Sequence, residues 1–206
     1  MNKTLRGAVG LLIAAVLLTA PGCGELTEPA ARAALSGTSA SFSEAPVSET
    51  GENGTVECLF PRAGQDAQKK LIQIIGSAEK TLDMAIYSFT DANIADAVVA
   101  CSRRGVTVRV ITDKTQSGGA YQKKILQRLK KEKIPIKMDS HSGIMHLKIT
   151  IADEKVATTG SYNYTKSADE ENDEVFVVLR SEETARQFEQ EFEDMWTDKK
   201  RFTNYS

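Results

Sequence analysis

The sequence H-L-K-I-T-I-A-D at residues 146–153, followed by G-S-Y-N at residues 160–163, decides which fold and which chemistry are expected. On an extended strand successive side chains alternate faces, so His146 and Lys148 share one face while Leu147 points to the other. The apolar face suits a core. The polar face presents an imidazole beside an ammonium. This pair suits a phosphodiester, because the lysine binds the anionic oxygens while the histidine attacks phosphorus or moves a proton.

These segments resemble the HKD motif of the phospholipase D superfamily. The family pattern H-x-K-x4-D-x6-G-S-x-N is matched without a change in spacing by His146, Lys148, Asp153, Gly160, Ser161 and Asn163. The next expected strand, in N-D-E-V-F-V-V, carries Glu174 where the nuclease branch of the family also places an acidic residue. Residues 82–90 resemble the second core strand of that branch, and the resemblance covers roughly residues 56–196.

The resemblance implies a phosphodiester hydrolase that works in two displacements, without a metal or another cofactor. His146 of one subunit would attack phosphorus and form a phosphohistidine, and the same residue of a second subunit would protonate the leaving oxygen and then activate water. Lys148 and Asn163 would hold the non-bridging oxygens of the transition state, and Ser161 would add a hydroxyl donor. Glu174 would orient His146 by accepting the other ring N–H.

Ordinary structural roles remain open for several of these side chains. Asp153 is expected to be structural in any case, because it lies at a turn and would fix the loop. Ser161 and Asn163 could simply build a turn, and Glu174 could be an exposed acid of an acidic patch. His141 is expected to lie in a loop, because the sequence offers no further metal ligands at useful spacing beside it.

The number of motifs bears on the oligomeric state. The full-length phospholipases of the superfamily carry two H-x-K motifs in one chain and join them into one site. This chain carries a single copy. The resemblance therefore implies a homodimer, in which two motifs meet across a two-fold axis to form a composite active site.

Charge is distributed unevenly along a chain whose formal net charge is −2. Residues 101–137 hold eleven Lys or Arg and two acids, whereas residues 169–198 hold twelve acids and two Arg. The basic stretch indicates either a solvated helix face or a wall that attracts a polyanion. Three functions remain open: a nonspecific endonuclease acting on DNA or RNA, a phospholipase D that releases headgroups from phosphatidyl lipids, and a non-catalytic nucleic-acid-binding lipoprotein. The intact motif favours the enzymes, and the single motif with its basic stretch favours the nuclease.

Residues 1–22 resemble a bacterial lipoprotein signal peptide. A basic start precedes an apolar run of thirteen residues, 8–20, which is shorter than the ~20 residues that span a bilayer. Cys23 follows in T-A-P-G-C and would become the lipidated N-terminus of an exported protein anchored to a membrane. A type I signal and an uncleaved anchor are the alternatives. Residues 23–55 are poor in large apolar side chains, which indicates a flexible tether.

Strand and helix patterns alternate across residues 56–198, the expected catalytic domain, with residues 199–206 as a C-terminal tail. Besides the motif strand, strands are expected at 56–60, 81–89, 106–112, 134–138, 156–159 and 174–179, and helices at 68–79, 91–104, 120–133 and from 181 onward. Helices between the early strands predict parallel pairs, and short turns between the late strands predict antiparallel pairs. The expected fold is α/β, with a mixed, largely parallel central sheet and helices on both faces.

The remaining cysteines and four aromatic residues leave alternatives open. Cys58 and Cys101 are expected to be buried free thiols, although a disulfide is chemically allowed in an exported protein. Four aromatic side chains near the motif strands either line a cleft, where one could stack on a base, or pack in the core. They are Tyr87, Phe89, Tyr162 and Tyr164.

Overall fold

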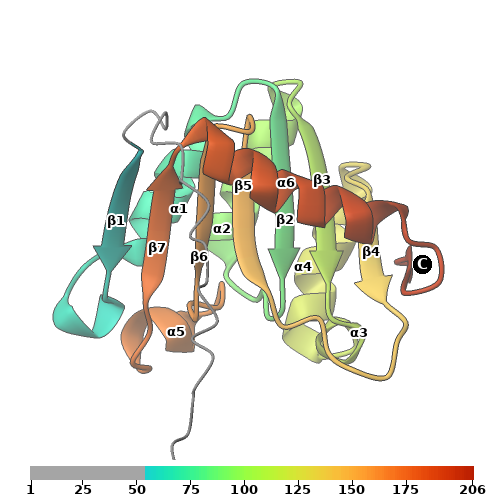
Figure 1. The fold of residues 1–206 in the computed structure, drawn as a ribbon. Helices are drawn as coiled ribbons and strands as arrows, with labels where there is room; N and C mark the ends of the chain where they lie inside the picture. Colours follow the sequence, from blue (N-terminus) through green and yellow to red (C-terminus); the bar gives the residue numbers. More distant parts are fainter. Residues whose placement is uncertain (1–53) are drawn as a thin grey trace, which may run out of the picture. The chain divides into compact units, whose positions relative to one another are not determined.

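A computed structural model describes residues 54–206, and its central feature is one eight-stranded sheet with the strand order β1-β7-β6-β5-β2-β3-β4-β8 (Figure 1). The strands are β1 Thr55–Leu59, β2 Thr81–Ile86, β3 Thr107–Thr112, β4 Ile136–Asp139, β5 Lys148–Ala152, β6 Val156–Gly160, β7 Phe176–Arg180 and β8 Phe202–Asn204. The helices are η1 Pro61–Ala63, α1 Ala67–Ser77, α2 Ala92–Arg103, α3 Lys114–Ser117, α4 Ala120–Lys131, α5 Lys166–Glu170 and α6 Glu182–Thr197.

The mixed α/β sheet is confirmed, but the expectation that it is largely parallel is wrong. Only the pairs β2–β3 and β3–β4 are parallel, and the other five pairs are antiparallel. A helix between two strands lets them run in the same direction, but it does not make them neighbours in the sheet. After β1 the chain passes through α1 to the centre of the sheet, so β1 at the edge pairs with antiparallel β7 instead of β2.

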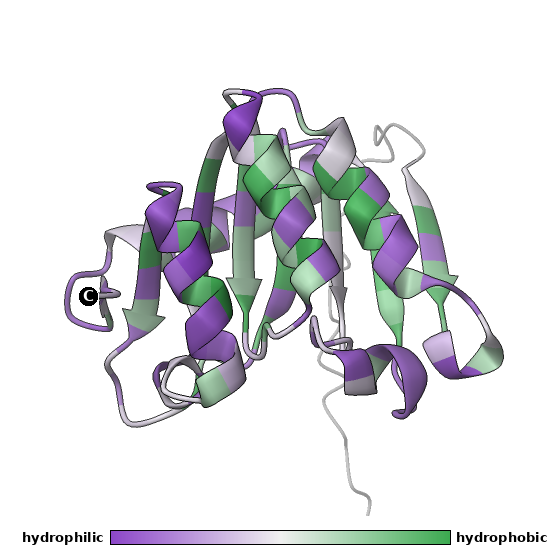
Figure 2. Ribbon diagram, turned by 180° about the vertical axis from the view of Figure 1, so that it is seen from behind, coloured by the Kyte–Doolittle hydropathy of each residue, from purple (hydrophilic) through white to green (hydrophobic). Residues whose placement is uncertain are grey.

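Helices cover both faces of the sheet, as expected. Within residues 54–206, α1, α2 and α4 pack on one face and α6 crosses the other (Figure 1). Seen from behind, helices α1, α2 and α4 turn polar residues outward and apolar residues toward the strands (Figure 2). The larger core cluster lies beneath them, and a smaller one, which includes Ile149, Ile151 and Phe192, lies beneath α6.

The helix ends follow the signals in the sequence. Asp91 caps α2 and accepts a hydrogen bond from the backbone N–H of Ile94 at 2.9 Å, and Gly105 lies just beyond that helix with φ 92°. Ser181 caps α6 by accepting from the N–H of Thr184 at 3.2 Å. On the inner side of α6, Ala185 and Phe192 are buried, whereas Phe188 and Trp196 are partly buried.

The segment expected as a C-terminal tail contributes a strand to the sheet. The segment 199–206 is no loose tail, because β8 pairs with β4 and the N–H of Tyr205 donates to the carbonyl of Ile136 at 2.9 Å. The expected signal peptide 1–22, the lipidated Cys23 and nearly all of the tether lie outside the described residues. In the described part of the chain, no helix combines the length and the apolar character needed to traverse a bilayer.

Both described cysteines are free, and one of them is not buried as expected. Cys101 is buried on α2, whereas Cys58 is exposed on the edge strand β1. The neighbour Glu57 points to the opposite face, where it forms an ion pair of 2.8 Å with Lys70 of α1. Alternation therefore directs Cys58 away from the helices that cover the other side.

Candidate active site

The motif residues meet where β2 and β6 end and β5 begins. The N–H of Tyr87, just after β2, donates to the carbonyl of Leu147 at 2.9 Å. Strand β5 starts at Lys148, which is paired with Ile86, so the strand begins two residues later than the alternation argument assumed. His146 therefore lies in the loop just before β5, and its side chain is exposed.

His146 and Lys148 are both arranged around one aromatic ring. The imidazole of His146 lies edge-on to the ring of Tyr87 with 4.6 Å between centroids. The Nζ of Lys148 lies 5.0 Å from the centroid of the same ring and donates to the carbonyl of His146 at 2.8 Å. Tyr87 thus holds the imidazole and the ammonium at the same end of the sheet. Gln116, whose Nε2 donates to the Tyr87 hydroxyl at 3.0 Å, supports the ring, and no sequence signal pointed to that glutamine.

Burial controls the charge of Lys148, which is only 6% exposed. Desolvation lowers the pKa of the ammonium from its ordinary value, and the negative charge of Glu174 partly opposes this by raising the same pKa. Since the charged form is penalised by burial, an anion that enters the site relieves that penalty.

Asn163 is held by the loop that follows β2. Its side-chain Oδ1 accepts from the N–H of Ser88 at 3.3 Å, while the N–H of Tyr164 donates to the carbonyl of Ser88 at 3.0 Å. The amide oxygen is therefore engaged with the backbone. Its NH2 group donates to none of the described residues, so it can donate to a ligand.

Glu174 does not hydrogen-bond to His146 in this chain, contrary to the role expected for it. Its Oε2 accepts from the hydroxyl of Ser161 at 2.5 Å, and its Oε1 accepts from the side-chain amide of Asn172 at 3.0 Å. The reason is that Glu174 lies in the loop before β7, directly opposite the end of β6. Ser161 in turn accepts from the N–H of Val175 at 3.1 Å, so its hydroxyl proton is committed to Glu174.

Gly160 makes this close approach feasible. Its φ is 131°, and a Cβ at this position would lie 2.1 Å from the carbonyl oxygen of Val175. Any other residue would push the β6 end away from β7. The glycine of the motif therefore sets the distance between Ser161 and Glu174.

Asp153 lies at the opposite end of β5 and organises a turn. Its carboxylate accepts from the backbone N–H groups of Glu79, Lys80 and Thr81 at 2.7–2.9 Å. Burial alone would raise the pKa of Asp153, but these N–H donors outweigh it and lower that pKa. The contacts tie the β5–β6 turn to the start of β2.

Three of the four aromatic candidates pack in the core. Phe89, Tyr162 and Tyr164 are almost fully buried, and the hydroxyl of Tyr164 lies 2.6 Å from the Thr150 hydroxyl. Only Tyr87 reaches the motif residues. Among residues 54–206, no three His, Cys, Asp or Glu side chains are grouped to hold a metal ion.

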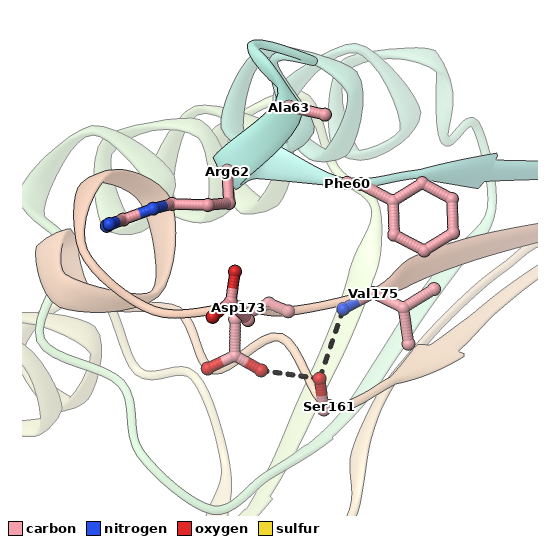
Figure 3. A pocket seen from close by; sticks show the side chains of 7 residues that line it. Phe60, Arg62, Ala63, Ser161, Asp173 and Val175 are labelled. Carbon is pink, nitrogen blue, oxygen red and sulfur yellow. Dashed lines mark hydrogen bonds between the residues drawn. The ribbon is translucent and has the colours of Figure 1, made fainter.

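A cleft of about 570 Å³ opens beside Ser161 and Glu174 (Figure 3). Its other lining residues come from η1 and its flank and from the loop before β7, and they are Phe60, Arg62, Ala63, Asp173 and Val175. Phe60 follows directly after β1, and the sequence predicted it only as part of a strand, with no role in the site.

Comparison with known proteins agrees with this arrangement. Residues 71–196 match the family model described as cardiolipin synthase, PLD-like domain. The chain is 32% identical over 142 residues to a phospholipase D from Rickettsia conorii, with 69% of each protein covered. It is 33% identical to the mitochondrial cardiolipin hydrolase of Canis lupus familiaris, over 75% of this chain and 59% of that protein.

Two solved structures match almost over their full length. Nuc from Salmonella typhimurium, a phospholipase D family member, superposes with a TM-score of 0.68 and 30% identity, over 74% of this chain and 98% of that one. NucT from Helicobacter pylori gives a TM-score of 0.67 and 27% identity, over 74% and 99% of the two chains.

Proposed function

From the premise that this chain belongs to the phospholipase D superfamily and is one of its phosphodiester hydrolases, we propose that its substrate is nucleic acid. In this proposal the protein is a nonspecific endonuclease that needs no metal and works through a phosphohistidine. The observation that carries the proposal is the end of the sheet at which an exposed imidazole and a buried ammonium lie against one tyrosine ring, with the side-chain amide of Asn163 held in the adjoining loop.

The chemistry assigned to each side chain follows from its contacts. His146 is exposed and supplies the ring nitrogen that attacks phosphorus, with the leaving oxygen taking a proton from His146 of the partner subunit. Lys148 and the NH2 group of Asn163 bind the non-bridging oxygens, where charge accumulates in the transition state. Ser161 donates to Glu174 here, so in the proposed mechanism this pair positions the loop beside Lys148.

A basic helix beside the site favours nucleic acid over other diesters. Helix α4 begins at the same end of the sheet, because Gln122 donates to the Thr112 hydroxyl at 2.8 Å and accepts from the N–H of Phe89 at 2.7 Å. Lys123 and Lys124 on its first turns are exposed. Cations along the approach to the site raise the local concentration of a polyanion.

A sheet face that residues 54–206 leave partly exposed supports the proposed homodimer. Phe176 and Val178 face the larger core, so Val177, together with its partner Cys58 on β1, faces the side of α6. On that side Val56 is 65% exposed, and α6 is the only described helix (Figure 1). In the proposed homodimer, two copies associate through this face about a two-fold axis, and their two HKD motifs form one site.

Phospholipase D activity is the second candidate, and the names of the sequence relatives favour it. The relatives include proteins called phospholipase D and mitochondrial cardiolipin hydrolase. A lipid substrate would use the same imidazole and ammonium, because it is also a phosphodiester.

One paired assay separates the candidates. We expect the wild-type protein to nick plasmid DNA in the presence of EDTA and to lose about 10⁴-fold or more of that activity in His146→Ala. Release of headgroups from phosphatidylglycerol vesicles with intact plasmid would instead establish the lipid activity. Tight DNA binding with neither activity would indicate a binding protein. Mixing His146→Ala with wild-type chains before the assay should reduce activity more than dilution does, if the site is composite.

We also propose that the protein is exported and held on a membrane through lipidated Cys23. The sequence around that residue supports the proposal. The full chain should incorporate labelled palmitate and sediment with membranes, whereas Cys23→Ser should do neither. Equal sedimentation of both proteins would contradict a lipid anchor.

A further inference from the structure

The cleft beside the catalytic residues is shaped by an aromatic side chain on a hydrogen-bonded turn. Phe60 is 47% exposed, and its ring lies at one end of the cleft (Figure 3). Its backbone is fixed on both sides, because its N–H donates to the side chain of Gln65 at 2.6 Å and its carbonyl accepts from the N–H of Ala63 at 2.9 Å. The ring therefore projects from a fixed turn that also contains Pro61. An exposed aromatic ring on a backbone held in this way is suited to stacking.

The polar groups of the cleft are mainly acceptors. Asp173 and Glu174 both line it, and none of the described residues donates a hydrogen bond to the Asp173 carboxylate. The guanidinium of Arg62 donates to the carbonyl of Glu171 at 2.6 Å and extends away from Phe60 (Figure 3). Carboxylates repel a phosphate and accept from amino groups, so the chemistry of the cleft suits a flat, uncharged group that carries N–H donors.

The position of the cleft limits what this group can be. Ser161 and Glu174 belong both to the cleft and to the candidate active site. A substrate whose phosphodiester lies against Lys148 therefore extends into the cleft with the group bonded next to that phosphate. In a nucleic acid this group is a nucleoside, and a volume of about 570 Å³ accommodates one.

We propose that this cleft binds the nucleobase next to the scissile phosphodiester, with Phe60 stacking on the base and Asp173 accepting a hydrogen bond from its exocyclic amine. The inference rests on the proposed function, because it requires a nucleic acid substrate, and it refines the nonspecific endonuclease to one with a preference at a single base. Cytosine, adenine and guanine carry such an amine, whereas thymine and uracil do not. The amine must be free of a pairing partner, so the cleft favours single-stranded over duplex substrate.

The test uses the full chain and three oligonucleotides of about twelve residues: oligodeoxycytidylate, oligothymidylate and a strand of abasic residues. We expect Phe60→Ala to lower kcat/KM for oligodeoxycytidylate about tenfold and to change cleavage of the abasic strand by less than about twofold, because one base–aromatic stack is lost. Phe60→Tyr should retain most of the activity. Tyr205→Ala, a partly exposed aromatic residue just after β8 at the opposite edge of the sheet, is the matched control and should match wild type.

Asp173→Ala tests the proposed hydrogen bond. Wild type should cleave oligodeoxycytidylate faster than oligothymidylate, and the substitution should bring the two rates close together. Glu170→Ala, an exposed acid on α5, should leave the ratio unchanged.

Different failures identify which proposal is wrong. A wild-type protein that cleaves neither plasmid nor oligonucleotides contradicts the nuclease function itself. Cleavage of DNA that is unaffected by Phe60→Ala, or affected equally on the abasic strand, overturns only the base site, and so does plasmid nicking with intact oligodeoxycytidylate. If Phe60→Ala lowers choline release from phosphatidylcholine vesicles while oligonucleotide cleavage is unchanged, the cleft binds a cationic headgroup, and the base site is wrong.

Discussion

Two cationic side chains lie on neighbouring parts of the same sheet and have opposite surroundings. Arg109 of β3 meets three carboxylates: Asp83 at 2.6 Å, Glu189 at 2.9 Å and Glu193 at 2.6 Å. Lys148 of β5 donates to a main-chain carbonyl and forms an ion pair with no carboxylate of the described residues. The first cation is neutralised within the fold, whereas the second is left with unused charge.

Aromatic contacts sharpen the difference. The guanidinium of Arg109 lies 5.0 Å from the ring centroid of Phe192 and 5.4 Å from that of Trp196, so it anchors α6 to the sheet. Lys148 lies over Tyr87, which also contacts the imidazole of His146. A compensated cation holds elements together, and an uncompensated one is available to an anionic substrate. The four predictions below test this distinction.

The largest effect is expected from Arg109→Met. The substitution leaves Asp83 buried without its cation, and we expect the free energy of unfolding to fall by about 3–5 kcal/mol, because a buried charge without a partner is costly. Urea denaturation measures the loss. Lys155→Met in the exposed β5–β6 turn is the control and should change stability by less than about 0.5 kcal/mol. A loss below about 1 kcal/mol would show that Arg109 does not hold α6 in place.

Lys148→Met should lower activity and leave stability intact, the reverse of what is expected for Arg109→Met. We expect kcat/KM to fall by about 10²-fold or more, because the site loses a donor aimed at the transition state. The free energy of unfolding should stay equal or rise, since burial lowers the pKa of Lys148 and methionine removes that penalised charge. A variant as unstable as Arg109→Met would place Lys148 among the structural cations.

Glu189→Gln should change how stability depends on pH. Burial, followed by the charge of Asp83, raises the pKa of Glu189 from 4.5 to about 7. The folded state then holds a proton that the unfolded state has released, so this group stabilises the fold at low pH and loses that contribution as pH rises from about 4.5 to about 7. Glu189→Gln should lack this part of the pH-dependent loss of stability, which is on the order of 1–3 kcal/mol. Melting curves across that range measure it, with exposed Glu191→Gln as the control.

The smallest effect is expected from Glu174→Gln. The negative charge of Glu174 raises the pKa of Lys148, so the substitution should lower that pKa further. The alkaline limb of the pH profile of kcat/KM should therefore move to lower pH, with little change in rate near neutrality. An unchanged limb would mean that Lys148 titrates independently of the loop before β7.

Local patterns in the sequence predicted most single elements well. Asp91, Gly105 and Ser181 mark helix ends through backbone hydrogen bonds and left-handed geometry, which depend only on nearby residues. The short elements η1, α3, α5 and β8 were missed, because three to five residues carry too little periodicity to identify them.

Pairing partners were harder to predict than elements. Helical connections suggested that β1 would join the parallel strands, yet β1 lies at the far edge beside β7. The neighbour of a strand depends on which faces can be buried together across the whole sheet, and that choice is not encoded in the strand itself. Cys58 is exposed for the same reason: the described helix that packs near β1 lies on the face opposite to its side chain.

The sequence by itself determined the reacting groups, because the identities and spacing of His146, Lys148 and Asn163 are properties of the chain. Only the tertiary structure decided their environments. It placed the imidazole and the ammonium against the ring of Tyr87, directed Glu174 to Ser161 instead of His146, and brought Phe60, just after the first strand, into the cleft beside Ser161. Such contacts join residues far apart in the chain, and packing energies that depend on all the strands together select them.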